Sequence, residues 1–205
     1  MLRTMKNGFS AVAISTMLLA ASLDARLSGA GAETGAEPSD ADIAAARAAA
    51  KELGTNLKAE LVAALEAGGP STALGVCRTV APSIAESASK AHGLKVGRTA
   101  LKVRNQDNAP DAFEQRVLKE FVEKIAAGSN PDALEHAEIV SEGGVKEFRY
   151  MKAIPTAARP CLACHGANVA PELKAQILDL YPEDRATGFK AGELRGAFTV
   201  RKVHE

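Results

Sequence analysis

The segment Cys161-Leu-Ala-Cys164-His165 constrains this chain most, because it places two of the three cysteines and one of the four histidines within one pentapeptide. This Cys-x-x-Cys-His spacing is typical of c-type haem attachment. In that chemistry two thiolates add to the vinyl groups of the porphyrin, and the adjacent histidine becomes an axial ligand of the iron. The spacing therefore predicts one covalent haem c, held by Cys161 and Cys164, with His165 on the iron.

Two other kinds of site use the same residues. Cys77, Cys161, Cys164 and His165 together would form a zinc set of three cysteines and one histidine, although consecutive Cys164 and His165 are poorly placed around one tetrahedral ion. A disulfide between Cys161 and Cys164 is the other alternative. Thioredoxin-like motifs of that kind normally open a helix after a strand, whereas here a proline precedes the motif and a glycine follows it.

The N-terminal residues 1–32 have the pattern of a cleaved export signal. Arg3 and Lys6 give a basic start, residues 9–23 are mostly apolar, and small residues fill 30–32. The apolar run is short for a membrane span, and no later stretch approaches the roughly twenty apolar residues that a span needs. We expect a soluble, periplasmic protein without stable membrane insertion after cleavage; an uncleaved anchor is the alternative. Residues 33–38 then form a flexible lead-in, and 39–205 a single domain.

Hydrophobic periodicity predicts an α+β fold, with helices leading and an antiparallel sheet following. Ser39 caps a long first helix that ends at Gly68-Gly69-Pro70, and Pro82 kinks the second helix close to Cys77. The glycine pair 143–144 predicts a hairpin. The apolar stripe of the first helix can pack on the protein's own sheet or on a second copy, as a homodimer. The predicted helices are 39–67, 71–93, 111–127 and 171–181, and the predicted strands are 97–104, 136–141, 145–154 and 195–203.

The second axial ligand has few candidates. Methionine is common in electron-carrying cytochromes, but beyond the predicted signal the chain has only Met151. Cys77 lies on the apolar face of its helix and is the sulfur left over once the thioethers form. A small buried core residue is its alternative role. The remaining nitrogen candidates are His92, near a helix end, His136, expected to be solvated at the start of a strand, and His204, expected to be frayed.

The sequence resembles a family of exported single-haem c domains with a PAS-like fold, found alone or as sensor modules of bacterial signalling proteins. The stretches that carry the resemblance are 76–85, 97–114, 161–166 and 181–200. It implies a PAS-like antiparallel sheet with a long N-terminal helix and flanking helices, and it implies Cys77 as the distal ligand opposite His165. Gln106 and Ala100 depart from the residues usual in the family, and neither is a ligand.

These expectations indicate a redox or small-ligand sensor, or a low-potential electron-transfer module, and no enzyme. A thiolate opposite an imidazole pushes electron density onto iron and stabilises its ferric state. Arg98, Arg104 and Arg195 are candidates to pair with the haem propionates, the alternative being a solvated strand face. The protein to which it reports or passes electrons is unknown, and balanced charge, with 25 basic and 25 acidic residues, does not indicate a nucleic-acid partner.

Two alternative functions remain open from the sequence. One is a cytochrome c′-like four-helix bundle whose five-coordinate haem binds nitric oxide or carbon monoxide. The other is a haem peroxidase, which needs an open distal position with polar groups, and no distal histidine-arginine pair marks this sequence.

Overall fold

The computed structural model describes residues 37–204, so the predicted export signal and the first part of the lead-in lie outside the described residues. None of the helices in the described part has both the length and the apolar character that a bilayer span requires. The principal elements are α1 (Asp40–Gly75), a π-helical turn (Val76–Val80), α2 (Ala81–His92), β1 (Lys95–Thr99), α3 (Ala112–Ala126), β2 (Glu135–Glu142), β3 (Val145–Pro155), α4 (Leu162–His165), α5 (Pro171–Leu180) and β4 (Leu194–His204).

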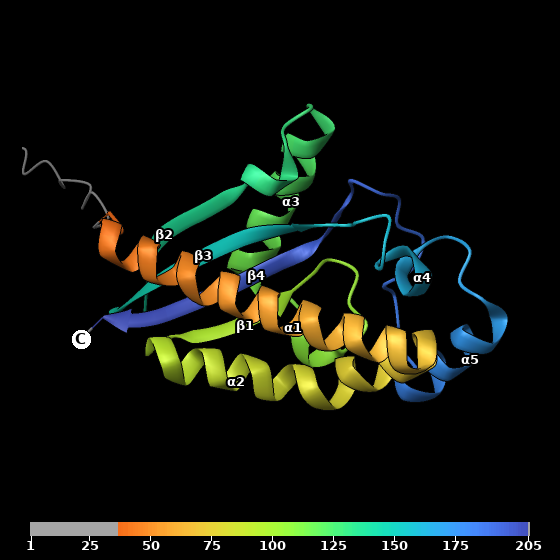
Figure 1. The fold of residues 1–205 in the computed structure, drawn as a ribbon. Coiled ribbons are helices and arrows are strands. Elements are labelled where there is room, and N and C mark those ends of the chain that lie inside the picture. Colours follow the sequence, from red (N-terminus) through yellow and green to blue (C-terminus); the bar gives the residue numbers. More distant parts are fainter. Residues whose placement is uncertain (1–36, 205) are drawn as a thin grey trace, which may run out of the picture. The chain divides into compact units, whose positions relative to one another are not determined.

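A four-stranded antiparallel sheet with the order β1-β4-β3-β2 forms the centre of the fold (Figure 1). Gly143 and Gly144 join β2 to β3 with φ angles of 58° and 83°, which is the left-handed conformation that a tight hairpin turn requires. The predicted α+β class and the predicted hairpin are therefore confirmed. The four-helix-bundle alternative is wrong, because the last strand of the chain pairs with both β1 and β3.

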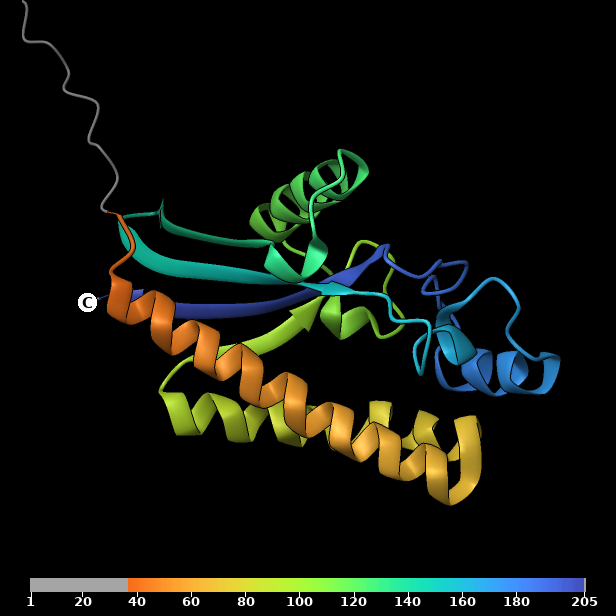
Figure 2. The same cartoon turned by 45° about the horizontal axis from the view of Figure 1, so that its top comes forward.

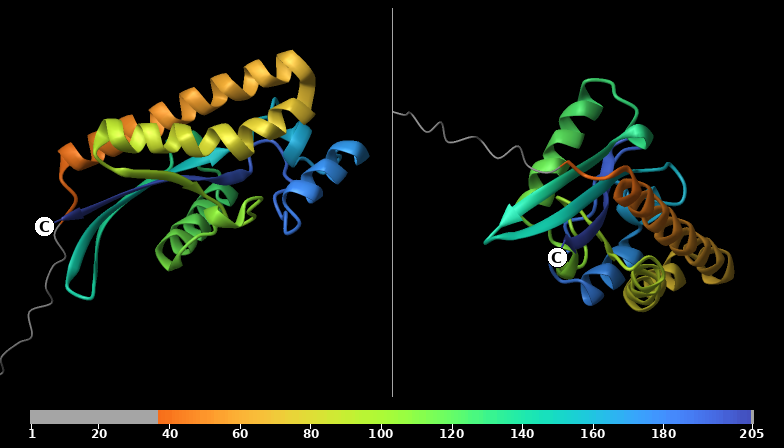
Figure 3. Two further views of the ribbon diagram at one scale, coloured as in Figure 1. Left: turned by 90° about the horizontal axis from the view of Figure 1, so that it is seen from below. Right: turned by 90° about the vertical axis from the view of Figure 1, so that its left-hand side faces the viewer.

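Helices cover both faces of the sheet, with α1 and α2 on one face and α3 on the other (Figures 2 and 3). Alternate residues of β3 point to opposite faces. Tyr150 packs against α1, where it belongs to one core cluster with Leu53 and the buried alanines of that helix. The next residue, Met151, packs against Val117 and Phe121 of α3. Phe148, like Tyr150, therefore belongs to the core beside α1.

The helical hairpin of α1 and α2 turns where the sequence predicts. Gly68 and Gly69 leave helical geometry, with φ angles of −160° and 71°, and Pro70 follows. The chain then doubles back, so that α2 runs beside α1 (Figure 1). The predicted N-cap is also present, because the Ser39 hydroxyl accepts a hydrogen bond from the Asp42 amide.

The disturbance expected around Pro82 takes the form of the π-helical turn Val76–Val80, which contains Cys77. The amide of Ala81 donates to the carbonyl of Val76, five residues earlier. Proline has no amide hydrogen, and its ring would clash with the carbonyl four residues before it, here that of Arg78. A local widening of the helix relieves that clash, and such π-helical turns are frequent at functional sites.

The strand predicted over 97–104 is wrong in its second half, because β1 ends at Thr99. The following segment leaves the sheet to contact later parts of the chain. The amide of Arg185 donates to the Val103 carbonyl at 2.9 Å, and the Arg104 side chain binds Asp184. His204, expected to be frayed, instead lies in β4.

An ion pair between Asp42 of α1 and Lys202 of β4, at 2.7 Å, predicts a pH-dependent contribution to stability. The hydrogen bond from Lys202, and after it that from Ser39, lowers the pKa of Asp42. A carboxyl group with a lowered folded-state pKa stabilises the protein above its unfolded pKa of about 3.9, and this contribution is lost as the pH falls through the folded-state value. Asp42→Asn should reduce the free energy of unfolding by about 1 kcal/mol or less at neutral pH.

The measurement is urea unfolding of the wild type and Asp42→Asn at about pH 7 and about pH 3. The difference between their free energies of unfolding should be smaller at about pH 3. Glu60→Gln is the matched control on the same helix, since Glu60 is exposed and no ion pair of it is found among residues 37–204. A stability deficit of Asp42→Asn that is the same at both pH values would contradict this interpretation.

Candidate functional site

The Cys-x-x-Cys-His segment forms the short helix α4 and the residue before it. The amide of His165 donates to the Cys161 carbonyl at 2.9 Å, so Cys161 and Cys164 lie three positions apart on one helical turn and share a face. All three cysteines carry free thiols. The disulfide alternative is thus not present in this structure. Within residues 37–204 no group of three or more histidine, cysteine, aspartate or glutamate side chains is placed to hold a metal ion.

Gly166 allows the chain to leave α4 in a sharp turn. A side-chain Cβ at this position would lie 2.6 Å from the carbonyl oxygen of Leu162, so that only glycine fits without a shift. The segment after α4 is held by a short parallel bridge. The amide of Phe189 donates to the His165 carbonyl, and that of Gly188 to the Gly166 carbonyl, both at 3.0 Å. Residues 186–189 therefore fix the position of His165.

The imidazole of His165 is held neutral with one nitrogen free. Its Nδ1 lies 2.7 Å from the Ala186 carbonyl oxygen, and because a carbonyl only accepts, Nδ1 carries the proton. Burial, followed by the positive charges of Arg195 and Arg104, lowers the pKa of His165 to about 2. The unprotonated Nε2 is then available as a metal ligand, and a backbone carbonyl on the other nitrogen is a common way of orienting such a ligand.

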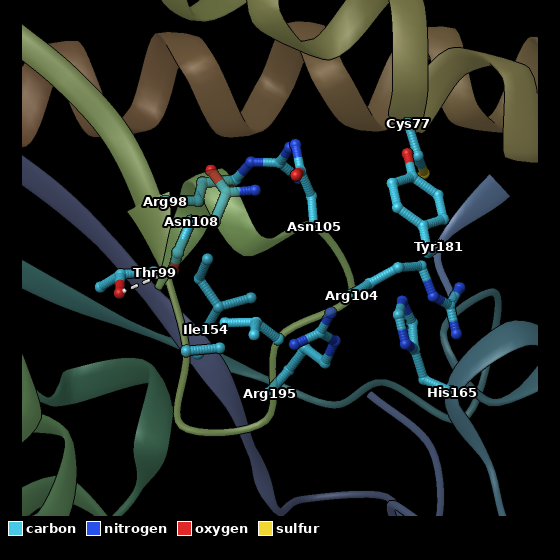
Figure 4. A pocket seen from close by; sticks show the side chains of 13 residues that line it. Cys77, Arg98, Thr99, Arg104, Asn105, Asn108, Ile154, His165, Tyr181 and Arg195 are labelled. Atoms are coloured by element: carbon cyan, nitrogen blue, oxygen red, sulfur yellow. Dashed lines mark hydrogen bonds between the residues drawn. The ribbon is translucent and has the colours of Figure 1, made fainter. Parts of the chain in front are cut away.

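Two adjoining cavities surround His165, and we call them the Cys77 cavities because Cys77 lines both. One has a volume of about 140 Å³ and is also lined by Tyr181 and all three predicted arginines (Figure 4). The other, of about 40 Å³, is lined by Leu61, Leu65 and all three cysteines. The fold thus brings together every site residue proposed from the sequence, from the π-helical turn, β1 and the loop after it, α4 with the preceding Cys161, and β4. Their roles toward a ligand stay predictions.

The three arginines differ in their partners. Arg104 is buried and is already paired, because it donates to Asp184 at 3.2 Å and to the Cys164 carbonyl at 2.7 Å. Arg98 and Arg195 have no carboxylate partner within residues 37–204. Burial lowers the pKa of Arg98 and lowers that of Arg195 to about 10. Two partly buried guanidinium groups therefore remain able to bind carboxylates that the protein itself does not supply.

None of the other candidate axial ligands lines the Cys77 cavities. Met151 is fully buried against α3. His92 lies 2.8 Å from a carboxylate oxygen of Glu52. His136 lies near Glu138 and His204 lies near Asp42. His136 was expected to be solvated but is half-buried.

Sequence reasoning missed two residues of the site, Tyr181 and Asp184. Tyr181 points its hydroxyl toward Cys77 (Figure 4), and burial, followed by the charge of Cys77, raises the pKa of Tyr181. Asp184 is the partner of Arg104, and its Oδ1 also accepts from the Ala186 amide at 2.9 Å. Both lie in the stretch 181–200, which is one of those that carry the family resemblance. That resemblance was the sequence feature from which they could have been proposed as site residues.

The fold and the site define a class: an α+β domain in which a Cys-x-x-Cys-His turn faces a cysteine from a helical hairpin. The family model described as Tll0287-like matches residues 20–202, and the chain belongs to this family. The crystal structure of the cyanobacterial heme-protein Tll0287 is similar, with 28% sequence identity and a TM-score of 0.60 over 82% of this chain and 98% of that one. A comparison with curated proteins gave no match. The resemblance noted in the sequence is thus confirmed at the level of a haem-protein family, while the single covalent haem c and the PAS-like fold stay predictions.

Gly196 of β4 lines the larger Cys77 cavity, and its close contacts allow a prediction for a substitution there. A Cβ there would lie 2.4 Å from the backbone oxygen of Thr99, where β1 and β4 approach closely. Gly196→Ala should lower the free energy of unfolding by about 1–3 kcal/mol through overpacking. Gly97→Ala on β1 is the matched control, because its Cβ would make only an ordinary contact of 3.7 Å. Equal urea midpoints for the two variants would be inconsistent with this account.

Proposed function

We propose that the protein is an exported, periplasmic c-type haem protein with a single haem. Cys161 and Cys164 form the two thioether bonds, and His165 and Cys77 are the axial ligands. One observation carries the proposal: Cys77 and His165, whose imidazole is neutral with an unprotonated Nε2, line both adjoining cavities, and the free thiols of Cys161 and Cys164 line the smaller one. The similarity to the heme-protein Tll0287 supports it independently.

The residues around the Cys77 cavities fit such a group. Leu61 and Leu65 of α1 supply an apolar wall beside the two cysteines of α4. Arg98 and Arg195 supply charge for two carboxylates, which matches the two propionates of a haem. When bound, the haem supplies an iron that changes oxidation state. The PAS-like designation of the sheet belongs to this proposal, because it rests on the family resemblance.

The function we infer is that of a redox or small-ligand sensor, or of a low-potential electron-transfer module. Thiolate ligation favours ferric iron and therefore a low reduction potential. Cys77 comes from the π-helical turn next to Pro82, a locally irregular part of the helical hairpin, so its position is coupled to the geometry of α1 and α2. We assign no catalytic step, since among residues 37–204 His165 is the only histidine that lines the Cys77 cavities.

The first test is the ferric spectrum of the mature chain produced with a haem c maturation system. We expect low-spin electron paramagnetic resonance signals of a thiolate-ligated iron, and we expect Cys77→Ala to abolish them. Met151→Leu is the matched control, because it removes the only other sulfur in the described residues outside the Cys-x-x-Cys-His segment and should leave the spectrum unchanged.

Other spectra would lead to different conclusions. High-spin signals in the wild type that Cys77→Ala leaves unchanged would reject Cys77 as a ligand and favour an open iron that binds gases or peroxide. A chain that acquires no covalent haem while Cys161 and Cys164 remain free would reject the whole proposal.

The arginines generate a second test of the proposal. Arg98→Gln removes a positive charge from the larger Cys77 cavity, and because positive charge favours the reduced state, the reduction potential should fall. Lys95→Gln is the matched control, since Lys95 is an exposed cation on the same strand. Optical redox titration measures both variants. A potential that moves equally in the two would show that Arg98 has no specific role near the haem.

A further inference from the structure

A third cavity, outside the proposed haem site, lies beside Phe189 and has a volume of about 390 Å³. We call it the Phe189 cavity. It is larger than either of the Cys77 cavities and falls in the range of about 300–1,000 Å³ typical of small-molecule sites. It lies between the C-terminal half of α3, the loop after β1 and the start of β4. Apart from Arg195 and Gly196, which it shares with the larger Cys77 cavity, none of its lining residues has a part in the proposed function.

The lining of the Phe189 cavity is mostly apolar. Two of its residues are large hydrophobics exposed to solvent, Leu101 at 40% and Val122 at 45%. Such residues carry unburied apolar area that a ligand can cover. The apolar lining residues are Leu101, Val122, Ile125, Ala126, Phe189 and Leu194.

Cations lie at one side of this apolar lining. The Nζ of Lys102 lies 5.1 Å from the centroid of the Phe189 ring, and the guanidinium carbon of Arg195 lies 5.3 Å from it. Neither cation has a carboxylate partner among residues 37–204. The acidic residue of the lining, Glu193, is itself engaged, because its carboxylate accepts a hydrogen bond from the Lys190 amide at 3.0 Å. This backbone hydrogen bond leaves the charge of Glu193 in place, so the two cations and one carboxylate give the lining a net formal charge of +1.

Arg195 forms part of the wall between the Phe189 cavity and the larger Cys77 cavity, since it lines both. A guanidinium group carries five N–H donors, so one arginine can face an anion on either side. Phe189 lies on the same wall, and its ring centroid is 6.3 Å from that of His165 in an edge-to-face arrangement.

We propose that the Phe189 cavity binds a small monocarboxylate with an apolar body, such as a medium-chain fatty acid. The apolar body packs on α3, Leu101 and Leu194, and the carboxylate lies at Lys102 and Arg195. Charge complementarity favours this occupant over a neutral one of the same shape, because Lys102 has no carboxylate partner among residues 37–204. Arg195, which the proposed function assigns to a haem propionate on its other side, keeps further N–H donors for a second anion. The site shares Arg195 with the larger Cys77 cavity, takes a different ligand and goes beyond the function proposed above.

The test is isothermal titration calorimetry of the full mature chain, as isolated, with octanoate and with 1-octanol as the neutral probe of the same chain length. We expect saturable binding of octanoate and several-fold weaker binding of 1-octanol. Lys102→Gln should weaken octanoate binding about two- to fivefold, as for a partly exposed ion pair. Lys119→Gln, which removes an exposed cation from α3 outside the cavity, should leave it unchanged.

A second pair of variants locates the site. Val122→Trp fills the cavity from its exposed rim and should abolish binding of octanoate. Val145→Trp makes the same change at a valine that is 52% exposed elsewhere on the sheet, and it should bind as the wild type does. Exposed positions of this kind are rarely critical for folding, and thermal unfolding checks this for each variant.

Three results would overturn the proposal: no saturable heat with octanoate, unchanged binding by Val122→Trp, or equal affinity for octanoate and 1-octanol together with no effect of Lys102→Gln. Haem content is measured separately by absorbance. None of the four substituted residues lines the Cys77 cavities. A failure of the proposed haem function would therefore be recognised independently of the octanoate titration.

Discussion

The buried guanidinium of Arg104 connects the parts of the chain on which the candidate site depends. It donates to Asp184 and to the Cys164 carbonyl, and so joins the loop after β1, the α4 turn and the segment that precedes β4. In that last segment, the Ala186 carbonyl also accepts a hydrogen bond from His165 Nδ1. Removing one partner of a buried ion pair typically costs about 3–5 kcal/mol, because the other charge is left unpaired. Arg104 therefore has a structural role, whereas Arg98 and Arg195 have no carboxylate partner among residues 37–204.

β4 belongs both to the sheet and to the walls of the cavities. It pairs with β1 on one side and β3 on the other, and its first residues, Arg195 and Gly196, line both the larger Cys77 cavity and the Phe189 cavity. The absence of a side chain at Gly196 permits the close approach to Thr99. β4 thus supports the core and also forms part of the wall between the two cavities.

The helical hairpin supplies Cys77, a candidate ligand that comes from neither the sheet nor α4. Pro82 removes one helical hydrogen bond, and the resulting π-helical turn contains Cys77 close to the cysteines of α4. The free thiol and the neutral imidazole are chemically different donors, and both line the same pair of cavities.

The sequence by itself determined the local features of this protein. Periodicity, the caps and the glycine pairs located α1, α3 and the β2–β3 hairpin, and the spacing of Cys161, Cys164 and His165 predicted covalent haem attachment, because all of these depend on residues within one or two turns. Only the tertiary structure decided the rest. It ended β1 at Thr99 and paired Arg104 with Asp184, left Arg98 and Arg195 without a carboxylate partner among residues 37–204, and formed the Phe189 cavity. Those outcomes depend on contacts between residues as many as 93 positions apart, and no local pattern encodes such contacts.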